Sequence, residues 1–83
     1  MKLTLYSKPD CHLCEDALAE LAHMRAKYPH ELEVVDITSD DRLRAAYGER
    51  IPVLRIGERE VDAPLTRMVL ERALRDASQT PSR

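Results

Sequence analysis

The spacing of hydrophobic residues changes from a strand pattern to a helix pattern within the first part of the chain. Residues 2–6 alternate around Leu3 and Leu5, which predicts a first β-strand. From residue 12 to residue 28 the apolar positions recur with helical spacing, and Pro29 is expected to end that helix. Its apolar stripe consists of Leu13, Cys14, Ala17, Leu18, Leu21, Met24 and Tyr28.

The middle of the chain predicts a second strand and a short helix. Residues 31–38 contain leucine, valine and isoleucine in a run that is typical of a mostly buried strand. Residues 39–41 are a serine and two aspartates, which are favoured N-cap residues. We expect them to start a short helix that runs to about Tyr47 and closes at Gly48.

The last third predicts a hairpin followed by a closing helix. Residues 53–56 and 58–61 are β-rich on either side of Gly57. The helix is expected from about residue 64 to residue 77, with a frayed polar tail at 78–83. Its outer face would carry Arg67, Glu71 and Arg75. The order β-α-β-α-β-β-α predicts one α/β domain over residues 1–77, with a four-stranded mixed sheet flanked by helices.

Composition excludes several classes of function. Thirteen basic and 15 acidic residues are interspersed and give a net charge of -2, so there is no basic stripe for nucleic acid or an anionic membrane. Three tyrosines without phenylalanine or tryptophan also argue against a base-stacking surface. No apolar run is long enough to span a bilayer, and two cysteines are few for a small secreted domain. A cytoplasmic protein is therefore expected.

The two cysteines, Cys11 and Cys14, form a CxxC motif where the first strand gives way to the first helix. The unsatisfied N–H groups and the dipole at a helix N-terminus stabilise a thiolate there. A CxxC in a βαβ pattern is typical of thiol–disulfide exchange. Cys14 falls on the apolar stripe, whereas Cys11 lies at the solvent-bordering end of the helix. We therefore assign Cys11 as the nucleophile and Cys14 as the resolving thiol.

Neighbouring charges would modify this site. Lys8 adds a positive charge three residues before Cys11 and is expected to favour the thiolate and an anionic substrate. Asp10 opposes that effect unless it caps the helix. His12, when protonated, would also stabilise the thiolate, but its position on the polar face equally fits an ordinary exposed histidine.

Ile51-Pro52-Val53 is the second feature of interest. A proline is awkward inside a central strand. If the bond between Ile51 and Pro52 were cis, the preceding backbone would be available to a bound extended chain, although isolated X-Pro bonds are mostly trans.

Together, Tyr-Ser-Lys-Pro-x-Cys-x-x-Cys at residues 6–14 and Ile-Pro-Val some 40 residues later resemble the glutaredoxin-like family of the thioredoxin superfamily. The resemblance covers about residues 2–77 and implies a thioredoxin-like fold of the glutaredoxin type. It also implies that Pro52 is cis and faces the CxxC, and that Cys11 attacks while Cys14 resolves. Lys8 would lie near the thiolate or bound glutathione, and no bound cofactor is expected.

Two departures from the family pattern indicate a divergent branch. The chain has Cys-His-Leu-Cys where dithiol members usually have Cys-Pro-Tyr-Cys, so His12 and Leu13 replace the proline and tyrosine. The Gly-Gly-Cys-Asp-Asp-like turn that holds one end of glutathione is replaced by a shorter segment containing Asp62. Asp62 either anchors a substrate or caps the last helix, and the cap is the favoured interpretation.

The resulting hypothesis is a small thiol–disulfide oxidoreductase of cell redox homeostasis that acts on a protein disulfide or a glutathione mixed disulfide. Expected substrate-binding residues are Lys8, His12, Leu13, Ile51, Pro52 and Asp62. Glutathione is a candidate reductant or co-substrate, and a monomer without nucleic-acid or membrane partners is expected.

Two alternatives remain at this point. A zinc site would need ligands from His12, His23 or His30 beside the cysteines; helix geometry argues against such a site within one chain and leaves open a zinc ion shared across a dimer. A non-enzymatic protein could instead use the CxxC as a redox switch that controls a protein partner.

Overall fold

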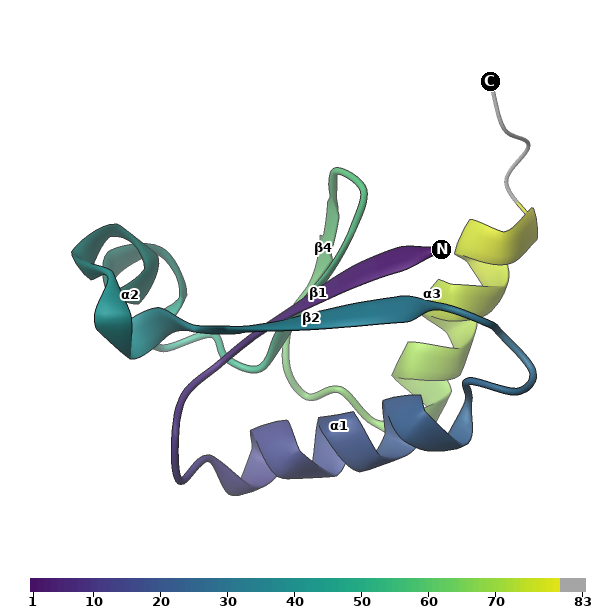
Figure 1. The fold of residues 1–83 in the computed structure, drawn as a ribbon, viewed down its shortest axis with the longest axis horizontal. Coiled ribbons are helices and arrows are strands. Elements are labelled where there is room, and N and C mark those ends of the chain that lie inside the picture. The colour runs from purple at the N-terminus through teal and green to yellow at the C-terminus, as the bar shows by residue number, and fades with distance from the viewer. Residues whose placement is uncertain (80–83) are drawn as a thin grey trace.

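The predicted fold class is confirmed by a computed structural model, which describes residues 1–79. A four-stranded mixed sheet is flanked by three helices (Figure 1). The elements in chain order are β1 (Lys2–Ser7), α1 (His12–His23), β2 (Glu31–Asp36), the 3-10 turn η1 (Ile37–Ser39), α2 (Asp41–Tyr47), β3 (Val53–Ile56), β4 (Arg59–Val61) and α3 (Arg67–Gln79). No helix among these is long and apolar enough to cross a membrane.

The sheet has the strand order β2-β1-β3-β4. β1 and β2 are parallel and are joined through α1, whereas β3 is antiparallel to both of its neighbours. Tyr6 in β1 pairs with Val53, the first residue of β3. The end of β1 and the start of β3 therefore lie side by side, at the end of the sheet from which the chain enters α1.

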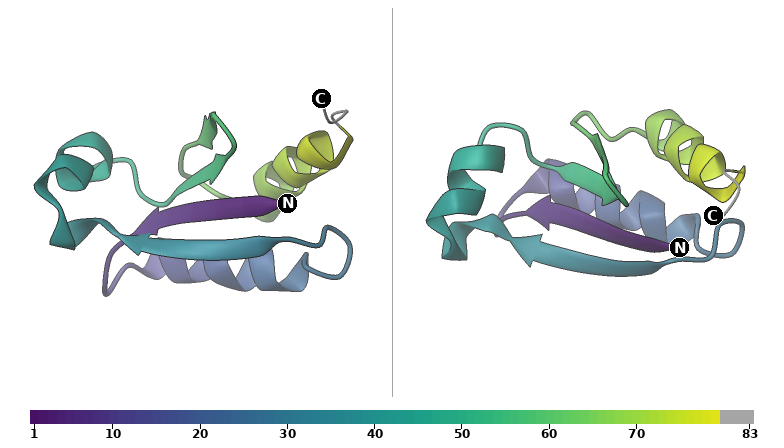
Figure 2. Two further views of the ribbon diagram at one scale, coloured as in Figure 1. Left: turned by 45° about the horizontal axis from the view of Figure 1, so that its top comes forward. Right: turned by 90° about the horizontal axis from the view of Figure 1, so that it is seen from above.

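Helices cover the two faces of the sheet unequally (Figures 1 and 2). The main core lies under α1 and α3, and it buries residues from both helices and from the two central strands. Its buried members are Leu3, Leu5, Ala17, Leu21, Met24, Tyr28, Leu54, Leu65, Leu70 and Leu74. A smaller cluster on the opposite face joins the sheet to α2 and η1 through Tyr6, Ile37 and Val53, with Leu43, Tyr47 and Ile51 packed against it.

The first helix is shorter than its periodicity predicts. It ends at His23, and residues 24–27 form turns rather than continuing the helix to Tyr28. Met24 and Tyr28 are nevertheless buried, because the turn keeps both side chains directed at the core. The chain must reverse to enter β2, and the residue before Pro29 is disfavoured in helical conformation. The apolar residues at 24 and 28 therefore belong to a turn that packs on the core, and the periodicity predicted too long a helix.

The second strand is also different from its prediction. It ends at Asp36 and is an edge strand, so the expectation of a mostly buried strand is wrong. Val34 is 49% exposed, and the strand order within residues 1–79 places β2 at the edge of the sheet. The Asp36 carboxylate accepts a hydrogen bond from the Thr38 backbone N–H at 2.8 Å, which turns the chain into η1.

The boundaries of the later elements follow from local caps. Asp40 caps α2 by accepting hydrogen bonds from two backbone N–H groups, and Gly57 has the positive φ of 62° that the hairpin turn needs. α3 begins at Arg67 rather than near residue 64, after Thr66, whose hydroxyl accepts a hydrogen bond from the Val69 N–H. It continues through residues 78 and 79, which were assigned to the tail, and residues 80–83 lie outside the described part.

Candidate active site

The CxxC motif begins at the N-terminal cap of α1. After β1 ends at Ser7, three residues turn the chain, and Asp10 adopts a positive φ of 59°. Cys11 is the N-cap, with extended backbone, and its carbonyl accepts the first helical hydrogen bond from the Glu15 N–H at 3.0 Å. Asp10 therefore does not cap the helix.

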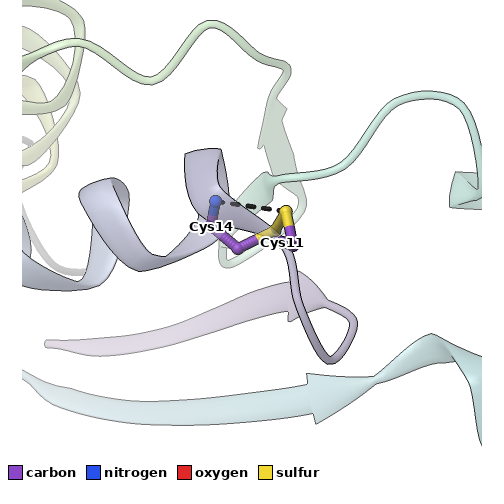
Figure 3. Close-up of a disulfide and its surroundings, with 2 residues drawn as sticks. All are labelled: Cys11 and Cys14. Atoms are coloured by element: carbon purple, nitrogen blue, oxygen red, sulfur yellow. Dashed lines mark hydrogen bonds between the residues drawn. A yellow bond between two sulfur atoms is a disulfide. The ribbon is translucent and has the colours of Figure 1, made fainter.

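Cys11 and Cys14 form a disulfide with a Cα–Cα distance of 5.2 Å (Figure 3). Cys14 is 1% exposed, whereas Cys11 is only partly buried. The Cys14 backbone N–H donates to the Cys11 Sγ over 3.2 Å. The helix N-terminus thus directs a hydrogen-bond donor at the more accessible sulfur and encloses the other sulfur in protein.

The residues around the motif are mostly exposed. Lys8 lies on the surface of the loop that precedes the motif. His12 is exposed and lies 3.5 Å from Asp16, with which it forms an ion pair when protonated. Leu13 is 59% exposed, although the apolar stripe predicted a core position. Leu13 instead borders a surface groove that Pro64 and Leu65 also line.

The Ile51–Pro52 peptide bond is cis, as predicted. The Pro52 side chain is fully buried, and Ile51 packs against the smaller core. Because Tyr6 pairs with Val53, continuing the antiparallel register by one residue brings Pro52 opposite Ser7. The cis proline thus lies at the same end of the sheet as the loop that carries Cys11. A second cis bond, between Ala63 and Pro64, was not predicted.

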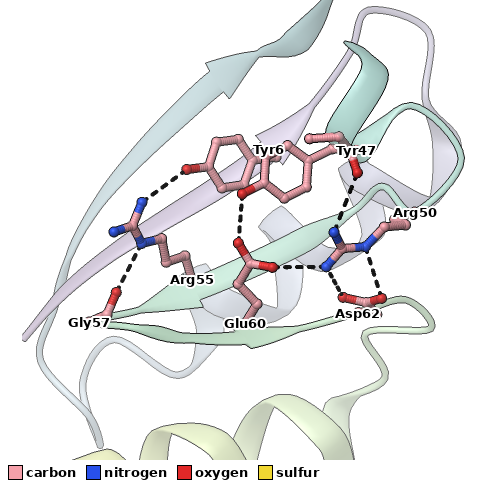
Figure 4. A network of polar contacts seen from close by, with 8 residues as sticks. Tyr6, Tyr47, Arg50, Arg55, Gly57, Glu60 and Asp62 are labelled. Atoms are coloured by element: carbon pink, nitrogen blue, oxygen red, sulfur yellow. Dashed lines mark hydrogen bonds and ion pairs between the residues drawn. The ribbon is translucent and has the colours of Figure 1, made fainter. Parts of the chain in front are cut away.

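Asp62 does not cap the last helix, so the favoured interpretation of this residue is wrong. Its two carboxylate oxygens accept hydrogen bonds from the Nε and Nη2 of Arg50, at 3.1 and 2.8 Å (Figure 4). Asp62 lies five residues before α3, and Thr66 occupies the capping position instead. The Asp62 carboxylate therefore forms an ion pair with Arg50, in the segment that precedes β3.

Arg50 is the centre of a polar network on the α2 side of the sheet (Figure 4). Its Nη2 also donates to Glu60, at 2.8 Å, and its guanidinium lies 5.1 Å from the centre of the Tyr47 ring. The Tyr47 hydroxyl donates to the other Glu60 oxygen at 2.6 Å. Tyr47 stacks on Tyr6 with ring centres 4.1 Å apart, so the network is anchored on β1.

These contacts shift the ionisation of the groups involved. The hydrogen bond to Glu60 raises the pKa of Tyr47 to about 12. The pKa of Glu60 is lowered by the Tyr47 hydroxyl and then by Arg50, and the pKa of Asp62 is lowered by Arg50. Both carboxylates, and chiefly Asp62, raise the pKa of Arg50. At neutral pH the network holds one cation between two carboxylates.

Sequence reasoning missed Arg50, Glu60 and Tyr47. A usable signal was present, because Glu60 and Asp62 are two positions apart across the end of a strand and so lie on the same face of the sheet. Two carboxylates on one face predict a cation opposite them. Arg50 lies two residues before the cis proline in the sequence, but only the sheet register shows that it lies next to Glu60 and Asp62.

The cysteines and histidines considered for zinc do not form a metal-binding group within residues 1–79. The two cysteines are bonded together, and the His30 Nδ1 lies 2.8 Å from the Tyr28 carbonyl. Within residues 1–79 there is no group of three or more histidine, cysteine, aspartate or glutamate side chains placed to hold a metal ion.

Comparisons with known proteins agree with this geometry. The profile of the family described as Glutaredoxin-like domain (DUF836) matches residues 2–76. The X-ray structure of protein XcR50 from X. campestris is 44% identical, with a TM-score of 0.77 over 95% of this chain and 99% of that one. The solution structure of Ne2328 from Nitrosomonas europaea is 35% identical, with a TM-score of 0.73 over 87% and 88%. A search of curated proteins gave no match.

Proposed function

The chain belongs to the glutaredoxin-like domain family, and from this premise we propose that it is a thiol–disulfide oxidoreductase acting through Cys11 and Cys14. The asymmetry of the disulfide carries the proposal: Cys14 is enclosed, whereas Cys11 borders solvent at the helix N-terminus. An accessible thiolate begins an exchange reaction, and a second thiol beside it completes the reaction.

The reaction starts from the reduced pair. The Cys11 thiolate attacks one sulfur of a substrate disulfide, a mixed disulfide forms, and the other substrate sulfur leaves as a thiolate. Cys14 then loses its proton and attacks the Cys11 Sγ, which releases the second substrate sulfur as a thiolate. Two electrons have passed to the substrate, and the Cys11–Cys14 disulfide is the product. An external dithiol, or two molecules of a monothiol such as glutathione, reduces it again.

The helix supports the first step. In the disulfide state the Cys14 N–H lies 3.2 Å from the Cys11 Sγ, and the positive end of the α1 dipole is at the same place. Both interactions are stronger with a thiolate than with a neutral sulfur. Cys14 has no comparable position, because it is inside the first turn and faces the core.

Exposed charges near the motif favour a protein disulfide over glutathione. Lys8 is a cation, but Asp10, Glu15 and Asp16 are exposed carboxylates within five residues of Cys11. Glutathione carries two carboxylates and one ammonium group, so this surface repels it on balance. We therefore propose that a protein disulfide is the main substrate and that glutathione acts as a reductant or a slow co-substrate.

Steady-state reduction of a protein disulfide, with dithiothreitol as the reductant, tests the proposal. Cys11→Ser should abolish exchange, whereas reduced Cys14→Ser, mixed with the protein disulfide after removal of dithiothreitol, should accumulate a mixed disulfide on Cys11 that intact-mass measurement detects. Limited alkylation of the reduced protein should label Cys11 first. Preferential labelling of Cys14, or an active Cys11→Ser variant, would contradict the assigned roles.

The same assay separates an enzyme from a redox switch. An enzyme reduces many equivalents of substrate for each protein molecule, whereas a switch protein oxidises and reduces only itself. A wild-type protein that stops after one equivalent in excess reductant would favour the switch.

A further inference from the structure

Arg50 contacts two carboxylates, and each of the three guanidinium nitrogens donates at least one hydrogen bond. The Nε and Nη2 donate to Asp62, and Nη2 also donates to Glu60 (Figure 4). Nη1 donates to the Ala46 carbonyl at 3.3 Å. The pair with Asp62 is bidentate, which is the geometry in which arginine binds any carboxylate. Asp62 therefore occupies the position that a carboxylate of another molecule would take.

This ion pair connects two segments at the end of the sheet where the CxxC motif lies. Arg50 is two residues before Pro52, which the sheet register brings opposite Ser7, four residues before Cys11. On the other side of the pair, Asp62 is two residues before Pro64. Pro64 lines the same groove as Leu13, which adjoins Cys14. A substrate bound across Cys11 would thus approach the pair from the end of the sheet.

The pair is also accessible. The side chain of Arg50 is 39% exposed and that of Asp62 is 48% exposed, so water and a small ligand can reach both. An exposed ion pair contributes little net free energy, so its partners exchange readily. Arg50 with Glu60 and Asp62 has a net charge of -1, which disfavours an approaching anion. Without the Asp62 carboxylate, the bidentate edge of the guanidinium would face solvent.

We propose that Asp62 and Arg50 determine the charge selectivity of the disulfide substrate. Asp62 occupies the guanidinium of Arg50 and thereby disfavours disulfides that carry carboxylates, while neutral disulfides are unaffected. Removing the Asp62 carboxylate opens Arg50 to a carboxylate of the substrate. This inference rests on the proposed oxidoreductase function and deepens it.

The test compares an anionic with a neutral disulfide, both at a common concentration of dithiothreitol. The anionic probe is the mixed disulfide of glutathione and cysteine, and the neutral probe is 2-hydroxyethyl disulfide. Asp62→Asn should raise kcat/KM for the anionic probe about threefold to fivefold, through KM, because one exposed carboxylate–arginine contact is gained. The rate with the neutral probe should be unchanged, and the gain should shrink in high salt.

Further variants show whether Arg50 is responsible. Asp62→Ala should behave like Asp62→Asn, whereas Arg50→Gln added to Asp62→Asn should remove the gain. Glu71→Gln is the matched control, because it removes a carboxylate from the exposed pair with Lys27, beyond the C-terminal end of α1. It should change neither rate. Thermal unfolding of each variant checks that the fold is retained.

Three results would overturn the inference. Equal changes with both probes would show that the pair only supports the fold, and a gain that survives Arg50→Gln would exclude Arg50 as the binding group. No change with the anionic probe would show that its carboxylates do not reach the pair. If the wild-type protein reduced neither these probes nor a protein disulfide, the proposed function itself would fail, which is a different outcome.

Discussion

Beneath α1 and α3 the sheet presents Leu3, Leu5 and Leu54, each without measurable exposure. On the opposite face it presents the ring of Tyr6, on which the ring of Tyr47 from α2 stacks. Around these rings Arg50, Arg55, Glu60 and Asp62 form a polar network that remains in contact with water. Buried apolar area contributes most of the stability of a small domain, whereas exposed ion pairs contribute little. The first face therefore supports the fold, and the second positions the segments beside the CxxC.

The largest effect is expected from a cavity on the apolar face. Leu21→Ala removes a fully buried side chain of α1 and should lower the free energy of unfolding by about 2–5 kcal/mol. Urea unfolding of the oxidised protein measures this change. Leu13→Ala is the matched control, since it makes the same substitution at an exposed site of the same helix and should cost less than about 0.5 kcal/mol. Equal losses at both sites would contradict the division between the faces.

A smaller effect is expected from the aromatic pair on the second face. The rings of Tyr6 and Tyr47 are nearly parallel, with an interplanar angle of 12°. A double-mutant cycle with Tyr6→Leu and Tyr47→Leu should give a coupling free energy of about 0.5–1.5 kcal/mol. Additive losses would mean that the stack does not connect α2 to β1, and the second face would then depend on its ion pairs alone.

Acid should weaken the polar network on the second face. The pKa values of Glu60 and Asp62 are lowered in the folded protein, chiefly by Tyr47 and by Arg50 respectively. A lowered carboxyl pKa stabilises the fold above the ordinary values of 4.5 and 3.8, and this contribution disappears as pH falls through the lowered values. Urea midpoints at pH 6 and pH 3 should therefore differ less in the Glu60→Gln/Asp62→Asn variant than in the wild type. An identical difference in both proteins would contradict the prediction.

The smallest effect concerns the ionisation of Tyr47 in alkali. The hydrogen bond to Glu60 raises its pKa to about 12, so the contact stabilises the fold below the ordinary value of 10 and is lost as pH rises through 12. Tyrosinate absorbance should show one tyrosine titrating near the raised value. Glu60→Gln should move that transition toward 10, and Tyr47→Phe should remove it. A transition that persists in Tyr47→Phe would belong to another tyrosine.

These two faces also differ in how far the sequence predicted them. The sequence predicted the order of elements, an N-cap among residues 39–41, the turn at Gly57 and the CxxC at the start of α1, because each depends on residues within a few positions. The cis bond before Pro52 was expected mainly from the resemblance. Local signals of this kind were sufficient to predict the residues of the apolar face and the position of the cysteine pair.

The errors have a common cause. Hydrophobic spacing shows which side of an element is apolar, but it does not show what covers that side. The apolar stripe predicted a helix that extends past the actual end of α1. Leu13, at the start of the stripe, is exposed, and Val34 is exposed on an edge strand. Each outcome was decided by the extent of the neighbouring layer, which is a property of the assembled sheet and helices.

The sequence by itself thus determined the fold class, the CxxC pair and the unequal burial of its two sulfurs, since helix periodicity alone separates Cys11 from Cys14. Only the tertiary structure decided the role of Asp62. Its partner Arg50 is 12 residues away and is brought to it by the pairing of β3 with β4. A carboxylate before a helix is locally indistinguishable from a cap, so the choice between cap and ion pair depended on a contact that exists only in the assembled sheet.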